Sequence, residues 1–281
     1  MKYVYLVCFF FIVSSGYSQE ARSRQLMEKM LNACDALKSA TFVLKSTERE
    51  LDGSLQESEM LIKMLTHPLS IYLYMISPHP GAECLWKSGQ SSNRVLVNPN
   101  GFPYINLKLS PSNSLLRQDS HHLISEIGFD YIVSMTWYYI SKMGDSFFNY
   151  LSITDTLMWD DRTCYELTFD YKPFRFFDYT IQPGETLTSV ANRFHVSDYV
   201  LLNHNPDVSD YDATKPGQKI KVPDFYNRKV MFYVDSRSLL PLVQITYDEK
   251  GFLEKYELKS FVINPVIGPD EFESTYATYG F

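Results

Sequence analysis

Residues 179–223 read YTIQPGETLTSVANRFHVSDYVLLNHNPDVSDYDATKPGQKIKVP. The stretch opens with a short alternating segment and a Pro-Gly turn at residues 183–184, a pair that favours a tight reversal. Thr186 is a typical helix N-cap, and apolar residues then recur at helical spacing. Ser197 is a second N-cap, and a Lys-Pro-Gly-Gln turn at residues 215–218 precedes an alternating strand. The predicted order is strand, helix, helix, strand.

Three motifs in this stretch resemble those of LysM, a family whose members bind N-acetylglucosamine-containing glycans such as peptidoglycan and chitin. They are GETL at residues 184–187, NPD at residues 205–207 and KPGQKI at residues 215–220. In the family, the first two loops flank a shallow groove that holds the N-acetyl group, largely through backbone donors and acceptors. The resemblance implies a glycan-binding site at Gly184, Glu185, Thr186, Leu187, Asn205, Pro206 and Asp207.

Two residues depart from the family pattern. Glu185 stands where aspartate is usual, and His204 stands where an apolar residue is usual, which would loosen the core or place a titrating group near the groove. The stretch carries a net charge of −1, so binding to an anionic wall would depend on sugar contacts rather than on bulk attraction. The alternative is that residues 179–223 are a purely structural insert.

The N-terminus reads MKYVYLVCFFFIVSSGYSQE. A basic start, a short apolar run and small residues are typical of a secretory signal peptide, here expected at residues 1–18. The run at residues 4–13 is short for a membrane span, although an N-terminal anchor is the alternative. We therefore expect export to the periplasm or cell envelope.

Composition narrows the function further. The chain of 281 residues carries a net charge of −7, which argues against nucleic acid as a partner. Aromatic residues make up 15%, including 21 Tyr and 19 Phe, which favours a β-rich fold. Export would leave Cys34, Cys84 and Cys164, so at most one disulfide forms inside the chain and its pairing stays open. Their spacing indicates no metal site.

The rest of the chain alternates like consecutive strands. A helix is expected at residues 22–37 and another at 129–143. Strands are expected at residues 41–51, 55–64, 70–76, 83–86, 94–97, 147–153, 155–159, 163–171, 229–235, 242–247 and 253–261. An Asp-Gly pair at residues 52–53 is a strong hairpin signal. The predicted fold class is α+β: a curved antiparallel sheet with packed helices, plus the inserted βααβ module.

The C-terminal part reads VMFYVDSRSLLPLVQITYDEKGFLEKYELKSFVINPVIGPDEF, from residue 230 to residue 272. It resembles the closing pattern of the LolA-like half-barrel superfamily: a strand, a Leu-Pro turn, two more strands, an Asn and a terminal Phe. The matching positions are Val234, Asp235, Leu240, Pro241, Gly251, Asn264 and Phe272. In that superfamily the concave face holds lipid or acyl chains, and several member families have no assigned function. The resemblance implies an apolar ligand for this part of the chain.

These observations predict a discontinuous half-barrel at residues 19–178 and 224–281, with the LysM-like module of residues 179–223 inserted at a hairpin tip. Acidic and histidine clusters near His121-His122 (with Asp119 and Glu126) and near Asp160-Asp161 (with Glu166) are interpreted as solvated loops. Because hydrolase, metalloprotease and phosphate-loop motifs are absent, we expect no catalytic residues, no metal and no cofactor.

The predicted function is therefore a non-enzymatic envelope protein that binds peptidoglycan or a related glycan and holds an apolar ligand. The alternatives are a periplasmic lipid or lipoprotein carrier and an unrecognised wall-active hydrolase, because paired carboxylates can be far apart in sequence.

Overall fold

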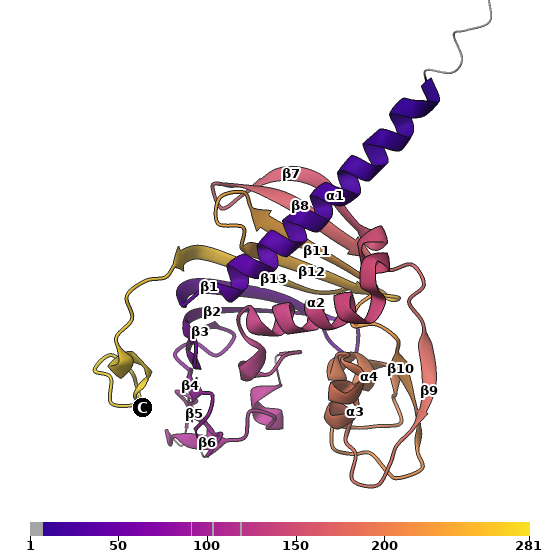
Figure 1. Ribbon diagram of the computed structural model, residues 1–281. Coiled ribbons are helices and arrows are strands. Elements are labelled where there is room, and N and C mark those ends of the chain that lie inside the picture. Colours follow the sequence, from indigo (N-terminus) through magenta and orange to yellow (C-terminus); the bar gives the residue numbers. More distant parts are fainter. Residues whose placement is uncertain (1–7, 91, 103, 119) are drawn as a thin grey trace, which may run out of the picture.

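The computed structural model describes residues 8–90, 92–102, 104–118 and 120–281, which form one large antiparallel sheet with helices on its inner side and a small module beneath it (Figure 1). The signal segment expected at residues 1–18 lies outside the described residues, apart from the helical backbone of residues 8–18. The predicted fold class is confirmed: a curved antiparallel sheet with packed helices and a separate βααβ module.

The large sheet has eleven strands in the order β6-β5-β4-β3-β2-β1-β13-β12-β11-β8-β7. The strands are β1 (Ser39–Arg49), β2 (Leu55–Thr66), β3 (Leu69–Ser77), β4 (Glu83–Lys87), β5 (Val95–Asn98), β6 (Leu107–Leu109), β7 (Leu151–Trp159), β8 (Arg162–Asp170), β11 (Lys229–Asp235), β12 (Pro241–Asp248) and β13 (Gly251–Ile263). The first and last long strands, β1 and β13, pair at the centre, so the C-terminal meander closes against the N-terminal hairpin.

Two helices cover the inner face of this sheet. Helix α1 (Cys8–Asp35) crosses it, and helix α2 (Asp130–Met143) lies in the space around which the strands curve (Figure 1). Met27, Met30 and Leu31 of α1 are at most 1% exposed and pack in the main core with Ile62 and Met64 of β2. The helices therefore bury the apolar side of the alternating strands, as a half-covered antiparallel sheet requires.

The C-terminal tail covers part of the opposite face. Phe272, in the short helix η4 (Pro269–Phe272), packs with Tyr72 and Leu85, whose side chains point away from the inner core. The ring of Tyr279 stacks on Tyr72 with 3.7 Å between centroids. The tail thus covers the outer face of the sheet at β3 and β4 with its own small apolar cluster.

The module consists of β9 (Phe176–Thr180), α3 (Leu187–Phe194), α4 (Asp198–His204) and β10 (Lys219–Pro223). Thr186 and Ser197 cap the two helices, as the sequence predicts. The strands β8 and β11, which flank the module in the chain, pair directly with each other. The module is therefore inserted at one end of this strand pair and leaves the sheet uninterrupted.

Polar and aromatic contacts fix the module against the rest of the chain, which we call the host domain. Arg117 of the host makes a two-pronged ion pair with Asp198, with both N–O distances 2.8 Å. The same guanidinium lies 3.6 Å from the centroid of the Tyr211 ring. Tyr199 and Val200 of α4 bury Leu253 of β13. Since the charges are partnered and the apolar surfaces are covered, the module is docked rather than tethered.

His204 lies at this docking surface and not in the core of the module. Its ring stacks on Phe176 at 4.4 Å, its Nδ1 lies 2.8 Å from Val200 O in the same helix, and its Nε2 pairs with Glu249 of the host. The expectation was that His204 either loosens the core or brings a titrating group near the groove; the structure places its ring at the contact with the host. The apolar position usual in the family is replaced here by a polar contact to the host, which explains the departure.

Three further expectations need correction. Residues 147–150 are not a strand but belong to the 3₁₀ helix η3 (Gly144–Tyr150), because Phe147 and Phe148 both turn into the core, which alternation forbids. Residues 151–159 form one strand, β7, with a register shift between Ile153 and Asp155 rather than a break. The short edge strand β6 was not predicted, because three residues carry too little pattern.

The cysteines whose side chains are described, Cys34, Cys84 and Cys164, are free thiols. Burial raises the pKa of the Cys34 thiol to about 12. The thiol therefore stays protonated and packs like a small apolar side chain. Among the helices within the described residues, none has both the length and the apolar character that a membrane span needs.

Candidate functional site

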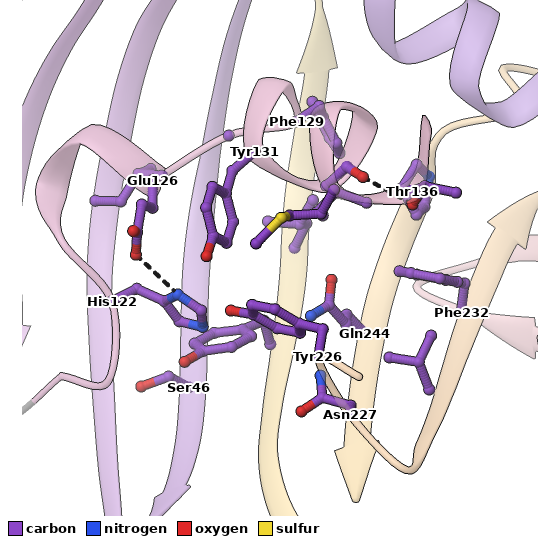
Figure 2. A pocket seen from close by; sticks show the side chains of 18 of the residues that line it. Ser46, His122, Glu126, Phe129, Tyr131, Thr136, Tyr226, Asn227, Phe232 and Gln244 are labelled. Carbon is purple, nitrogen blue, oxygen red and sulfur yellow. Dashed lines mark hydrogen bonds and ion pairs between the residues drawn. The ribbon is translucent and has the colours of Figure 1, made fainter. Parts of the chain in front are cut away.

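A cavity of about 200 Å³ lies between α2 and the inner face of the sheet (Figure 2). Alternate residues of β1 face it, because successive side chains of a strand point to opposite sides. Its apolar body is lined by Met27, Phe42, Leu44, Met60, Phe129, Ile132, Phe147, Phe169, Phe225, Phe232, Leu242 and Leu258. These side chains come from both helices and from strands on both sides of the β1–β13 pair, so the cavity is a property of the whole host domain.

One end of the cavity is polar. It is lined by Ser46, Glu48, Ser58, His122, Glu126, Tyr131, Tyr226, Asn227, Gln244 and Tyr256, most of them visible in Figure 2. Within the described part of the chain, no lysine or arginine lines the cavity. The site therefore combines a long apolar wall with an end that carries carboxylates but no permanent cation.

Two buried glutamates meet at this end, where Glu48 lines the cavity and Glu254 lies beside it. Glu48 of β1 and Glu254 of β13 are direct cross-strand partners, and they are 1% and 2% exposed. Like charges directly opposite each other destabilise a sheet. His121, itself 3% exposed, resolves the conflict: its Nδ1 lies 2.9 Å from Glu254 Oε2, and its backbone N–H donates to Glu48 Oε2. Tyr256 donates its hydroxyl to Glu48.

His122 extends the network to the cavity wall. Its Nδ1 lies 3.1 Å from Glu126 Oε2 and its Nε2 lies 3.3 Å from Glu254 Oε1 (Figure 2). Both ring nitrogens face carboxylates, so both donate when the ring is an imidazolium. Burial by itself lowers the pKa of His122, but the charge of Glu254 and the hydrogen bonds to both glutamates outweigh it and hold that pKa well above 6.5. Burial likewise opposes ionisation of Glu254, yet the charge of His122 holds the Glu254 pKa below its usual range.

The interpretation of His121 and His122 as part of a solvated loop is therefore wrong. Asp119, the third residue of that group, lies outside the described residues. The missed partners are Glu48 and Glu254, which are far from the histidines in sequence. One signal pointed to them: both occupy inward positions of alternating strands, where a carboxylate needs a buried partner.

This network predicts a specific pH dependence of stability. Because the His122 pKa is raised on folding, its contribution is complete below 6.5, the pKa of the unfolded state, and is lost as pH rises towards the folded value. We expect the free energy of unfolding to fall above that pH by up to about 1.4 kcal/mol per pH unit, and His122→Asn to remove this slope. Urea unfolding at a series of pH values measures it. An identical pH dependence in both proteins would count against the network.

The network also touches the inserted module. The ring of His121 stacks on Tyr199 of α4 with 3.6 Å between centroids, and the Tyr199 hydroxyl donates to the backbone oxygen of Arg49 at 2.5 Å. The ring of His121 is therefore one of the contacts between the network at the polar end of the cavity and the module.

The residues predicted for glycan binding lie on two loops of the module. Gly184, Pro206 and Asp207 are exposed, whereas Leu187 is fully buried in the module's core. Gly184 has φ +81°, which a glycine adopts without strain. The first loop is held by the segment after the second: Leu187 N–H donates to Tyr211 O, and Thr214 donates to Glu185 O. These two bonds tie the first loop to residues 211–214.

Several of these side chains are already committed within the module. The Asn205 amide bridges α4 and β10 by donating to Leu201 O and Lys221 O and accepting from Lys221 N–H. The Glu185 carboxylate accepts from Gln182 N–H and pairs with Arg193. Thr186 caps α3. A ligand at these loops would therefore meet mainly backbone groups and the exposed Pro206 and Asp207.

Comparison with known families decides what the module is. Its residues 179–223 match the model of the LysM domain. Residues 179–223 form a LysM domain. Residues 37–175 of the host match the model of a family described as "Protein of unknown function (DUF1571)". No curated protein matches the chain. The LysM domain is thus inserted in a host domain of which residues 37–175 match that family model.

Several solved structures resemble the chain in outline. In the MucA/MucB complex of Pseudomonas aeruginosa, the matched chain is 12% identical with TM-score 0.44; the match covers 90% of this chain and 60% of that one. Lipoprotein LppX of Mycobacterium tuberculosis is 12% identical with TM-score 0.42, and the match covers 88% of this chain and 98% of that one. A LolA superfamily protein of Nitrosomonas europaea is 11% identical with TM-score 0.33, and the match covers 89% of this chain and 96% of that one. This chain thus spans well under two thirds of the first of these chains. All the TM-scores are low, so the likeness says nothing of ligand or activity.

Proposed function

We propose that this protein binds N-acetylglucosamine-containing glycan, such as peptidoglycan, through its LysM domain, and that the host domain holds an apolar ligand in its cavity. The observation that carries the proposal is the aromatic-lined cavity of about 200 Å³ in a chain that also carries a LysM domain. Burial of apolar surface is the main favourable term for such a ligand. Mostly apolar lining with a few convergent polar groups is typical of small-molecule sites.

The glycan is expected to lie across the loops at residues 184–187 and 205–207, where Gly184, Pro206 and Asp207 are exposed. Glu185, Thr186, Leu187 and Asn205 would shape this groove from beneath, since their side chains are engaged in the module. This role places the protein outside the cytoplasm, in the periplasm or cell envelope, in agreement with the signal segment proposed at residues 1–18. In this proposal residues 19–178 and 224–281 form the host domain.

Binding is favoured over hydrolysis. A carboxylate hydrolase needs an acid and a base that reach the sugar. Glu48 and Glu254 are buried and engaged by His121 and Tyr256, so they offer no open face to a glycan chain. The cavity favours a second binding role instead, that of a carrier of lipids or lipoprotein acyl chains. A carrier would release its ligand to acceptor vesicles, whereas a fixed ligand would stay with the protein.

The glycan role is tested by sedimentation with purified sacculi. Asp207→Trp places an indole at the exposed edge of the second loop, and we expect it to lower the fraction that sediments by about tenfold, because bulk there blocks the groove. Lys219→Trp is the matched control, since Lys219 is also exposed in the module but lies on β10. Equal retention of wild type and Asp207→Trp, or no retention of either, would contradict the glycan role.

A further inference from the structure

The polar end of the cavity carries more carboxyl groups than imidazole rings. Glu48, Glu126 and Glu254 meet two imidazoles, those of His121 and His122. As no lysine or arginine belongs to the described lining, an anionic group placed here would find carboxylates and no permanent cation. Burying an unpaired charge beside like charges is strongly unfavourable.

The one cation on the wall has no hydrogen left for a ligand. Both ring nitrogens of His122 lie within 3.3 Å of carboxylate oxygens, so both N–H groups are taken. A carboxylate or phosphate on a ligand would have to displace Glu126 or Glu254 to reach this ring. The imidazolium therefore neutralises the protein's own glutamates and does not form an anion site.

The same end holds an acceptor without a donor. Asn227 is 4% exposed and lines the cavity, and its Oδ1 has no hydrogen-bond partner (Figure 2). A buried carbonyl left unpaired costs about 1–3 kcal/mol, so a donor supplied by a ligand recovers that energy. Tyr226 and Gln244 line the same cavity as Asn227 (Figure 2).

We infer that the cavity selects an alkyl or acyl chain whose head is not anionic and donates a hydrogen bond, such as a hydroxyl, an amide or an amine, and that it rejects free fatty acids. The chain lies along the aromatic wall, and the head donates to Asn227 Oδ1 at the polar end. This inference rests on the apolar-ligand role proposed above and adds the chemistry of the head to it.

The test uses the full chain and four probes of equal chain length: decanol, decylamine, decanoic acid and methyl decanoate. Each competes at neutral pH with N-phenylnaphthylamine, an uncharged fluorescent probe of apolar cavities. We expect decanol and decylamine to bind at least about tenfold more tightly than decanoic acid, because decanoic acid would have to bury the charge of its carboxylate. Methyl decanoate, which is neutral but lacks a donor, should bind about fivefold more weakly than decanol.

Two variants assign the selectivity to this end of the cavity. Glu126→Gln removes one carboxylate from the wall, and the ratio of decanol to decanoic acid affinity should fall about tenfold. Asn227→Leu removes the acceptor, and decanol should then bind no better than methyl decanoate. Glu273→Gln, at an exposed carboxylate outside the cavity lining, is the control and should keep the wild-type ratios.

The outcomes separate the two proposals. If decanoic acid binds wild type as tightly as decanol, the head-group inference is wrong while the apolar-ligand role stands. Unchanged ratios in both Glu126→Gln and Asn227→Leu would also overturn the inference. If none of the four probes displaces N-phenylnaphthylamine, the apolar-ligand role itself fails, and the inference fails with it.

Discussion

Replacing His121 by leucine is expected to lower the free energy of unfolding by about 3–5 kcal/mol. The change removes the ring nitrogen that faces Glu254 Oε2, whereas the backbone N–H at this position still donates to Glu48 across the β1–β13 pair. Removing one partner of a buried charged group costs this much because the Glu254 carboxylate stays buried and keeps only His122 and Tyr256 as partners. It also removes the ring that stacks on Tyr199, which loosens the LysM domain from the host.

Urea unfolding at neutral pH measures this loss. His67→Leu is a matched control, because His67 is exposed and we expect its replacement to change stability by less than about 0.5 kcal/mol. In the double variant with Glu254→Leu, an apolar pair replaces the ionic one, and much of the lost stability should return. A loss below about 1 kcal/mol for His121→Leu would show that the network does not hold the two strands.

Filling the cavity is the second change with a large expected effect. Leu44 lies on β1 between Phe42 and Ser46 on the inner face and lines the cavity. Leu44→Trp would place an indole in the space of about 200 Å³. We expect the affinity for N-phenylnaphthylamine to fall at least about tenfold, while overpacking costs about 1–3 kcal/mol of stability.

Val43→Trp is the control for this change, because Val43 is the next residue of the strand and points to the opposite face. It should keep probe binding close to wild type. Urea unfolding of both variants confirms that each is folded under the conditions of the assay. Equal probe binding by Leu44→Trp and wild type would show that the probe does not occupy this cavity.

The sequence predicted those parts of the fold whose signals are local. Asp52-Gly53 fixes the first hairpin, and Gly53 has φ +87° as that turn requires. Thr186 and Ser197 set the helix starts of the LysM domain because capping depends on neighbouring residues alone. The 3₁₀ helix at residues 144–150 escaped prediction, since its aromatic residues suit a strand equally well by propensity.

The site was predicted only in part, because it is assembled over long distances in sequence. The cavity could be expected from the resemblance to a half-barrel, but its polar end joins His121 to Glu48 and Glu254, which are 73 and 133 residues away. In the sequence, His121 and His122 are typical of an exposed loop. Only the pairing of β1 with β13 brings the two glutamates next to them. The contact of His204 could not be predicted for the same reason, since its partner Glu249 is distant in sequence and belongs to the host.

The proposed function requires one chain to hold an apolar ligand and a glycan together. It is tested by loading the protein with radiolabelled decanol, adding purified sacculi, and measuring the label that sediments with them. We expect label to sediment with wild type and either Asp207→Trp or Leu44→Trp to abolish this. Asp207→Trp would release the protein from the glycan, and Leu44→Trp would exclude the ligand from the cavity. Sedimentation of label at the same level with both variants, or no sedimentation with wild type, would contradict the account.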